Sequence, residues 1–214
     1  MSYRQVMMLH TTPDKRGTIL AAAFEVFISY GFRKTSMDDI ARAAGMSRPA
    51  LYQVFRNKTE IFRAASQSLL VKFGHETRAA FDSDKPFAER LFNSIDQSIL
   101  SLHRKIDATP HGAELMGVNA EVAGDIEEKW CDMMVDAIAE GVTEAESRGE
   151  IALAPLGVDA HRVATIVMQA MEGMKAKYLR GEPIEDDVRH MVNFVAGALA
   201  ISIRTTSECK SGLG

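Results

Sequence analysis

Apolar residues recur every three to four positions along most of the chain, which is the spacing of one face of an α-helix. Strict alternation of apolar and polar residues, which is typical of a half-buried strand, forms no series. Clusters of turn residues at positions 83–86 and 109–112 interrupt the helical pattern. The helices predicted in this way cover residues 14–30, 57–82, 87–105, 113–148, 159–179 and 184–204. The pattern therefore predicts an all-α fold.

Residues 35–58 predict two short helices that are joined by a tight turn. Thr35 and Ser36 can cap a helix with two Asp residues in its first turn, which is an Asp version of the capping box. Gly45 stands where this helix would end in the left-handed conformation, and Ser47 can cap the next helix. The apolar positions on the facing sides of the two helices are Ile40, Ala41, Ala44, Leu51, Val54 and Phe55. The stretch is a helix-turn-helix, and its second helix is the candidate for the major groove of DNA.

Charge is distributed unevenly along the 214 residues. Residues 1–65 contain ten Lys or Arg and five Asp or Glu, so their net charge is +5. The remaining residues contain fifteen basic and twenty-four acidic side chains, so their net charge is −9. The basic segment coincides with the helix-turn-helix, which indicates a protein that presents one end to a polyanion.

Residues 13–65 resemble the DNA-binding domain of the TetR family of bacterial transcriptional regulators. The residues that carry this resemblance are Gly31, Phe32, Thr35, Ile40, Ala41, Ala44, Gly45, Met46, Ser47, Ala50, Leu51, Tyr52, Phe55 and Lys58. The resemblance implies an N-terminal three-helix domain with a helix-turn-helix, followed by a larger helical domain that binds a ligand and dimerises. The domains expected on this basis are a flexible arm at 1–12, the DNA-binding domain at 13–65, the effector-binding and dimerisation domain at 66–205 and a tail at 206–214. A small apolar or amphipathic effector would release such a repressor from a palindromic operator in double-stranded DNA.

The resemblance also assigns DNA contacts to individual positions. The expected DNA-binding residues are Thr35, Ser36, Arg42, Ser47, Arg48, Ala50, Tyr52, Gln53 and Lys58. On the second helix, Arg48 can read guanine and Gln53 can read adenine, while Ala50 can touch a thymine methyl group. Arg42 can add a contact to a phosphate.

Three of these positions, Thr35, Tyr52 and Lys58, correspond to phosphate contacts of the family, which fix the register without reading sequence. Lys58 would start a helix, where a cation is unfavourable unless a phosphate shares the site. Tyr52 could instead be a core aromatic, but its neighbours already supply the core side, which favours an exposed hydroxyl. Val54 departs from the family, which usually has His or Tyr there, so one polar backbone contact is missing.

The last two predicted helices, at 159–179 and 184–204, indicate an interface. The second of them is apolar on almost all sides, so it needs neighbours on most sides. The resemblance implies a homodimer in which these two helices meet their copies as a four-helix bundle. Burial within the same subunit is the alternative.

The resemblance further implies a small-molecule cavity between helices of the middle of the chain. The candidate lining residues are His103, Met116, Trp130, Met133, Met134, Met168 and Met171. Methionine adapts to loosely shaped apolar pockets, but methionines at helical spacing also form ordinary cores. A protein partner, or no effector at all, remains an alternative because a filled core and a hollow pocket have the same composition.

Several observations argue against other compartments. Cys131 and Cys209 are too few for a disulfide framework, which indicates a reducing compartment. Charged residues interrupt the N-terminus, so we expect no signal sequence there. The most apolar run, 191–203, is shorter than the roughly 20 residues that a membrane helix needs. We therefore expect a cytoplasmic protein without a membrane partner.

The sequence contains no evident catalytic motif. The six histidines show no metal-binding spacing, and Asp187 with His190 is a single acid–histidine pair, whereas a di-iron bundle needs two pairs and further acids. We therefore expect neither a cofactor nor a metal, and no enzymatic activity. The alternative is an all-helical enzyme or cofactor-carrying bundle whose basic N-terminal domain is incidental.

Overall fold

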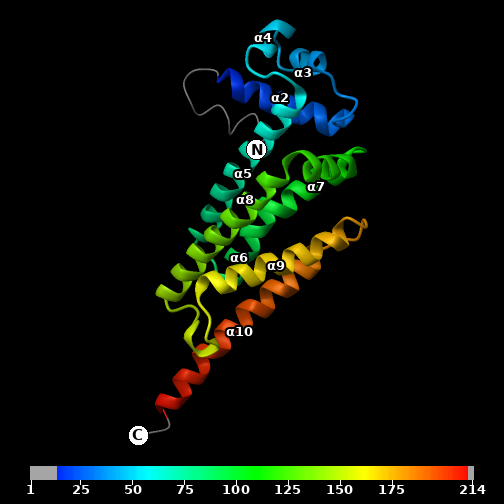
Figure 1. The fold of residues 1–214 in the computed structure, drawn as a ribbon. Coiled ribbons are helices and arrows are strands. Elements are labelled where there is room, and N and C mark those ends of the chain that lie inside the picture. Colours follow the sequence, from blue (N-terminus) through cyan, green and yellow to red (C-terminus); the bar gives the residue numbers. More distant parts are fainter. Residues whose placement is uncertain (1–13, 212–214) are drawn as a thin grey trace. The chain divides into compact units, whose positions relative to one another are not determined.

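A computed structural model describes the backbone of residues 14–211, and the side chains of this range except those at 113 and 201–211. The described chain is helical and contains no strand, as the hydrophobic spacing predicts (Figure 1). It divides into two compact units. The first unit contains described residues 14–71 and 102–128, and the second contains 72–101 and 129–211. The arm expected at 1–12 lies outside the described residues.

The first unit begins with three helices, α2 (Lys15–Tyr30), α3 (Met37–Ala43) and α4 (Arg48–Tyr52). It continues with the start of α5 (Lys58–Phe81) and then takes in most of α7 (Ser101–Asp107) and the first half of α8 (Gly112–Ser147). The predicted DNA-binding segment 13–65 is therefore only part of this unit.

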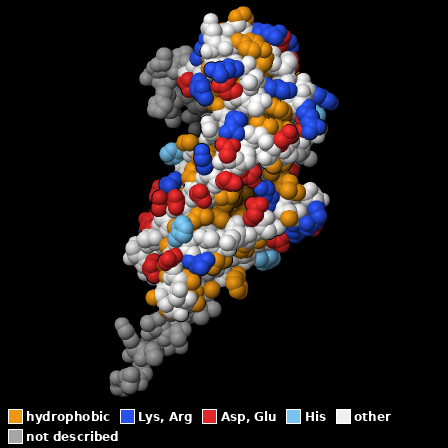
Figure 2. All heavy atoms as spheres, viewed as in Figure 1, with side chains coloured by type: hydrophobic (Ala, Val, Ile, Leu, Met, Phe, Trp, Pro, Cys, Tyr) orange, Lys and Arg blue, Asp and Glu red, His pale blue; other side chains and the backbone are white. Residues whose placement is uncertain are grey.

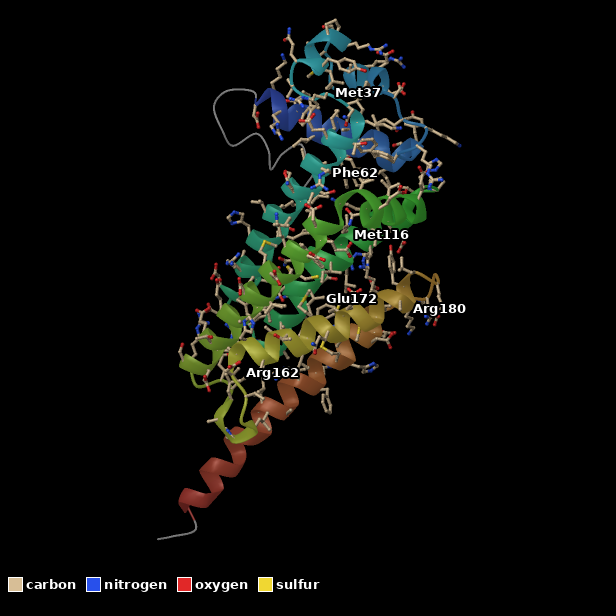
Figure 3. All side chains as sticks on the ribbon, viewed as in Figure 1. Met37, Phe62, Met116, Arg162, Glu172 and Arg180 are labelled. Carbon is tan, nitrogen blue, oxygen red and sulfur yellow. The ribbon has the colours of Figure 1, made fainter. Side chains whose placement is uncertain are left out.

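The core of the first unit joins α2 to the helix-turn-helix and to α8. Phe27, Phe32 and Phe62 form an aromatic cluster with ring centroids 5.2–5.6 Å apart. Figure 3 labels Phe62 on α5 and Met37 on α3, which are both buried in this core. Other buried members are Ile19, Leu20, Ala23, Ile40, Ala41, Leu51, Phe55, Ile61, Leu115, Val118, Ala123 and Ile126. Four of these residues come from α8, so the core draws on two distant parts of the sequence.

The second unit contains the rest of α5 and α8, with α6 (Phe87–Ile95), a π-helical segment (Asp96–Leu100), α9 (Ala160–Tyr178) and α10 (Glu185–Ser211). Its core includes Leu91, Ile95, Met134, Ile138, Val142, Val163, Val167, Val188 and Val192. The loop before α9 contains one short 3₁₀ turn, Ala154–Leu156.

A buried cation lies at the edge of this second core. The guanidinium of Arg90 is fully buried and donates to the Glu150 carboxylate at 2.6 Å and to the Phe81 carbonyl at 3.2 Å. A buried charge is tolerated only when it is paired, and these two acceptors provide the pairing.

Some helix bounds differ from the sequence-based prediction. The predicted helix 87–105 contains the π-helical segment and ends at Asp107. The last helix runs to Ser211 rather than to residue 204. Within α8 the non-helical residue is Ala123, with φ −135° and ψ 23°, directly before Gly124. No helix in the described part of the chain is long and apolar enough to span a membrane.

Candidate nucleic-acid interface

The first helix of the helix-turn-helix, α3, starts with the predicted capping box. Asp39 N donates to Ser36 Oγ at 3.2 Å, and Ser36 N donates to the Asp39 carboxylate at 3.0 Å. The Ser36 hydroxyl also donates to this carboxylate, and that hydrogen bond is the main cause that lowers the pKa of Asp39. Two backbone N–H groups at this helix end are therefore satisfied by local side chains.

The turn after α3 requires a glycine. Gly45 has φ 68°, a left-handed conformation that side chains with a Cβ rarely adopt. Ser47 then caps α4 by accepting a hydrogen bond from Ala50 N at 3.4 Å. The helix spans only residues 48–52, with Gln53 as its C-cap.

The short α4 separates its buried and exposed sides clearly. Leu51 is fully buried in the core of the first unit, whereas Arg48, Tyr52 and Gln53 are exposed. The Tyr52 side chain is 42% exposed, so it is not a core aromatic. Figure 2 shows Lys and Arg side chains (blue) beside acidic ones (red) over the part of the first unit that contains α3 and α4. These exposed side chains can meet base edges and phosphates.

Arg48 has two neighbours within this surface. Its Nη1 lies 3.2 Å from the Asp38 carboxylate on α3, and its guanidinium carbon lies 5.5 Å from the centroid of the Tyr52 ring. Hydrogen bonding to Tyr52, followed by the charge of Asp38, raises the pKa of Arg48 above its usual range. Sequence reasoning missed Asp38 as a partner because the pair joins two helices. The only signal was the opposite charge ten positions earlier.

Two predicted phosphate contacts, Thr35 and Lys58, have partners inside the loop of residues 31–36 that joins α2 to α3 (the α2–α3 loop). Thr35 is 3% exposed, and its hydroxyl donates to the Gly31 carbonyl at 2.6 Å. The Lys58 ammonium donates to the carbonyls of Phe32 at 2.7 Å, Arg33 at 3.0 Å and Thr35 at 2.9 Å.

An ammonium has three donors, so this loop uses all of those of Lys58. Burial lowers the pKa of Lys58, and the charge of Glu114 opposes this shift. Three carbonyl dipoles therefore already offset the charge that the sequence led us to pair with a phosphate. Lys58 holds the shape of the α2–α3 loop.

The other predicted DNA contacts lie around α3 and α4. Arg42 is exposed and lies 3.8 Å from the Asp39 carboxylate. Ser36 and Ser47 are the two N-caps, and Ala50 is half-buried. Arg42, Arg48, Tyr52 and Gln53 are therefore the exposed long side chains among the nine.

The seven residues predicted to line an effector cavity are distributed over both units. His103 on α7 and Met116 on α8 are half-buried and belong to the first unit (Figure 3). The other five belong to the second unit: Trp130 and Met133 are partly buried, and Met134, Met168 and Met171 are buried in its core. The indole N–H of Trp130 is buried and has no hydrogen-bond partner among the described residues. Their role as effector contacts stays a prediction.

The second unit has an open surface hollow of about 1070 Å³, away from these seven residues. Its lining combines Arg78 and His161 with several carboxylates, among them Asp136, Glu140 and Glu144. Two of the five lining carboxylates are in ion pairs, because Arg78 binds Glu140 at 2.6 Å and Arg148 binds Glu144.

Comparisons with known proteins agree with this geometry. A family model described as bacterial regulatory proteins of the tetR family matches residues 19–65. The HTH-type transcriptional activator FasR of Mycolicibacterium smegmatis is 28% identical over 193 residues, which are 87% of this chain and 84% of that protein.

Solved structures show the same fold. A transcriptional regulator from Cytophaga hutchinsonii superposes with a TM-score of 0.66 at 20% identity, over 87% of this chain and 95% of that one. SmeT, the repressor of the Stenotrophomonas maltophilia multidrug efflux pump SmeDEF, has a TM-score of 0.57 at 17% identity, over 86% of this chain and 89% of that one. SmeT has also been solved in complex with triclosan. The helix-turn-helix, the family model matched over residues 19–65 and the shared fold together support a TetR-family DNA-binding transcriptional regulator.

Proposed function

We propose that the protein is a homodimeric repressor that binds a roughly palindromic operator and leaves it when a small apolar or amphipathic ligand binds. The observation that carries this proposal is the exposed side of α4. Arg48, Tyr52 and Gln53 stand outward there, while Leu51 anchors the same helix in the core. A short helix that is anchored in the core on one side and carries polar side chains on the other is suited to enter a major groove.

The exposed residues divide into two kinds of contact. Arg48 and Gln53 read guanine and adenine edges, and Ala50 contacts a thymine methyl group. Tyr52 and Arg42 bind phosphates and set the register. Thr35 and Lys58 act on DNA binding through the α2–α3 loop, since their polar atoms already have partners there.

The dimer is proposed to form through α9 and α10. Phe194 on α10 is 79% exposed and Ile166 on α9 is 47% exposed. Large apolar side chains on two neighbouring helices favour a partner surface. A two-fold dimer presents two α4 helices to half-sites about 34 Å apart, which is one turn of DNA.

The effector is proposed to bind in the second unit. SmeT binds triclosan, and triclosan is a small molecule. In this chain Trp130 offers a buried N–H without an acceptor, and Met133 and Met134 lie on the same helix. A ligand that carries one acceptor on an apolar body would satisfy this N–H. Such a ligand shifts the population toward a state that no longer matches the operator only if it prefers that state.

The experiment that tests the proposal is binding of the purified protein to labelled DNA from the intergenic region beside its own gene, at two salt concentrations. We expect tight binding that exceeds binding to unrelated DNA of equal length and weakens with salt. The Tyr52→Ala protein is the control and should bind far more weakly. Equal weak binding to the two DNAs, also in a genome-wide selection of bound fragments, would contradict sequence-specific binding.

Repression and ligand release are tested separately. A reporter gene behind the bound DNA should be transcribed less when the protein is present, whereas higher transcription would make the protein an activator, as FasR is named. Adding apolar compounds such as triclosan to the DNA-bound protein should release DNA if the effector proposal holds. Release that persists in a Trp130→Phe variant would contradict the assigned N–H contact.

A further inference from the structure

We propose that Asp38 determines the sequence specificity of the protein by positioning the guanidinium of Arg48 for base reading. The inference rests on the proposed role of Arg48 in reading guanine. Asp38 itself is a positioning residue, because it acts through Arg48 and need not contact a base.

The two residues come from different helices of the helix-turn-helix. Asp38 is in the first turn of α3, and Arg48 is the first residue of α4. Their side chains are 51% and 58% exposed, and Arg48 Nη1 lies 3.2 Å from the Asp38 carboxylate. The guanidinium carbon lies 5.5 Å from the centroid of the Tyr52 ring, and Arg48 also hydrogen-bonds to Tyr52. The guanidinium therefore has two neighbours, Asp38 on α3 and Tyr52 on α4.

This arrangement leaves donors of Arg48 for a base. A guanidinium carries five N–H donors, and a bidentate contact to guanine O6 and N7 needs two of them. Asp38 uses one donor and the hydrogen bond to Tyr52 uses a second, so three remain. A free arginine on a surface helix would sample many rotamers and could equally well bind a phosphate. Contacts with Asp38 and Tyr52 restrict the rotamers of Arg48 before DNA binds. This restriction lowers the entropy cost of the base contact.

The pair is difficult to explain by stability alone. An exposed ion pair contributes little to folding, since solvent screens it. Asp38 also lies at the N-terminus of α3, where a negative charge is favourable, but Asp39 already supplies a carboxylate there as part of the capping box with Ser36. A carboxylate beside a DNA-reading residue repels the phosphate backbone and lowers the affinity for any DNA. Asp38 therefore lowers the affinity for DNA of any sequence and increases the discrimination between operator base pairs.

The proposal predicts opposite effects on affinity and specificity. The experiment measures binding of the full-length protein to its selected operator, to operator variants with single base changes and to unrelated DNA. Asp38→Asn should bind unrelated DNA more tightly than the wild type, because one negative charge is removed. Its discrimination should fall about fivefold to tenfold at the base pairs that Arg48 reads, which is part of what a bidentate contact supplies, and stay unchanged elsewhere.

Three further proteins make the result specific. In the Arg48→Ala background, Asp38→Asn should change discrimination no further, since the residue that it positions is gone. Asp38→Glu keeps the charge and should retain discrimination in part. Glu25→Gln removes another exposed negative charge of the first unit, on α2 and outside the Asp38–Arg48 pair, and should leave discrimination unchanged.

The outcomes separate this inference from the proposed function. If Arg48→Ala relaxes base preference but Asp38→Asn does not, the positioning role is wrong while base reading by Arg48 stands. If Asp38→Asn still changes discrimination in the Arg48→Ala background, Asp38 contacts a base itself and the positioning role is again wrong. If Arg48→Ala leaves base preference untouched, base reading by Arg48 fails, and the inference fails with it.

Discussion

The Glu114 carboxylate accepts a hydrogen bond of 2.8 Å from the backbone N–H of Arg33, although 81 positions separate the two residues. Arg33 lies in the α2–α3 loop, and a Cβ added to Gly31 in the same loop would lie 2.3 Å from Glu114 Oε2. Lys58 binds the carbonyls of this loop from α5. The loop before the helix-turn-helix is therefore held by a carboxylate from α8 and an ammonium from α5.

Replacing Glu114 by Gln should loosen this loop. Removing the charge weakens a charge-assisted hydrogen bond and the attraction to Lys58, so we expect a loss of about 1–2 kcal/mol in the free energy of unfolding. DNA affinity should fall alike for all sequences, because the loop reads no base. Urea unfolding and DNA binding measure the two effects. Glu121→Gln changes an exposed carboxylate on the same helix and is the control. Equal behaviour of the two variants would contradict the role of Glu114.

Truncating Arg48 and truncating Tyr52 should have different consequences for DNA binding. Arg48→Ala should cost about 1–3 kcal/mol at particular base pairs and relax the preference there. Tyr52→Ala should weaken binding to all sequences alike, because its hydroxyl is assigned to a phosphate and reads no base. Binding to a panel of operator variants measures both patterns. Uniform weakening by Arg48→Ala would contradict its assignment as a base contact.

The capping box of α3 should make stability depend on pH. The pKa of Asp39 is lowered in the folded protein, mainly by the Ser36 hydroxyl, so its contribution is present above the unfolded value of 3.8 and is lost as the pH falls through the lower folded value. Ser36→Ala should lower the free energy of unfolding at pH 7, and its difference from the wild type should shrink below pH 3.8.

The matched control for this pH effect is Ser47→Ala at the start of α4. Ser47 caps through Ala50 N, and no carboxylate takes part in that cap. The loss caused by Ser47→Ala should therefore be the same at both pH values. Chemical unfolding between pH 3 and pH 7 checks both variants, and a parallel pH course would contradict the Asp39 contribution.

Gly141 should resist substitution because the ring of Phe81 packs on its backbone. A Cβ at Gly141 would lie 2.3 Å from Phe81 Cγ, and an aromatic ring in a core cannot move aside easily. We expect Gly141→Ala to destabilise the protein by about 1–3 kcal/mol. Gly117→Ala on the same helix has nothing within 4 Å and should stabilise it by about 0.5–1 kcal/mol. Thermal unfolding separates the two, and stabilisation by both would show that α5 and α8 are not so close at this point.

Phe194→Glu should convert the proposed dimer into a monomer. The side chain is 79% exposed on α10, so the change leaves the core of the subunit intact and places a charge on the proposed interface. Analytical ultracentrifugation measures the mass. Tyr30→Glu, at the end of α2 and 62% exposed, should stay dimeric. A dimeric Phe194→Glu protein would contradict an interface through this residue.

The local features of the fold could be predicted from the sequence, because each depends on a few adjacent residues. The cap of Ser36, the left-handed Gly45 and the cap of Ser47 were predicted from residue type and spacing, and the structure confirms all three. The exposure of Tyr52 was also predicted correctly, because Leu51 and Phe55 already occupy the buried side.

Contacts between distant residues could not be predicted. No hydrophobic spacing or local motif in the sequence indicates the three carbonyls around Lys58. The same holds for the hydrogen bond from Arg33 to Glu114. The non-helical Ala123 was also unexpected, since alanine is the best helix former. The effector residues remain a prediction, because a methionine in a core and a methionine beside a ligand occur at the same spacing.

The first unit is built from two stretches of chain, 14–71 and 102–128, and this limits how the protein can be modified. A fragment cut after Val71 would lack the side chains of Leu115, Val118 and Ile126 and leave their partners on α2 and α5 in contact with water. Such a fragment should aggregate or unfold. Chimaeras that exchange operator specificity between related regulators therefore need two grafts, one for each stretch, or only the few exposed positions of α3 and α4.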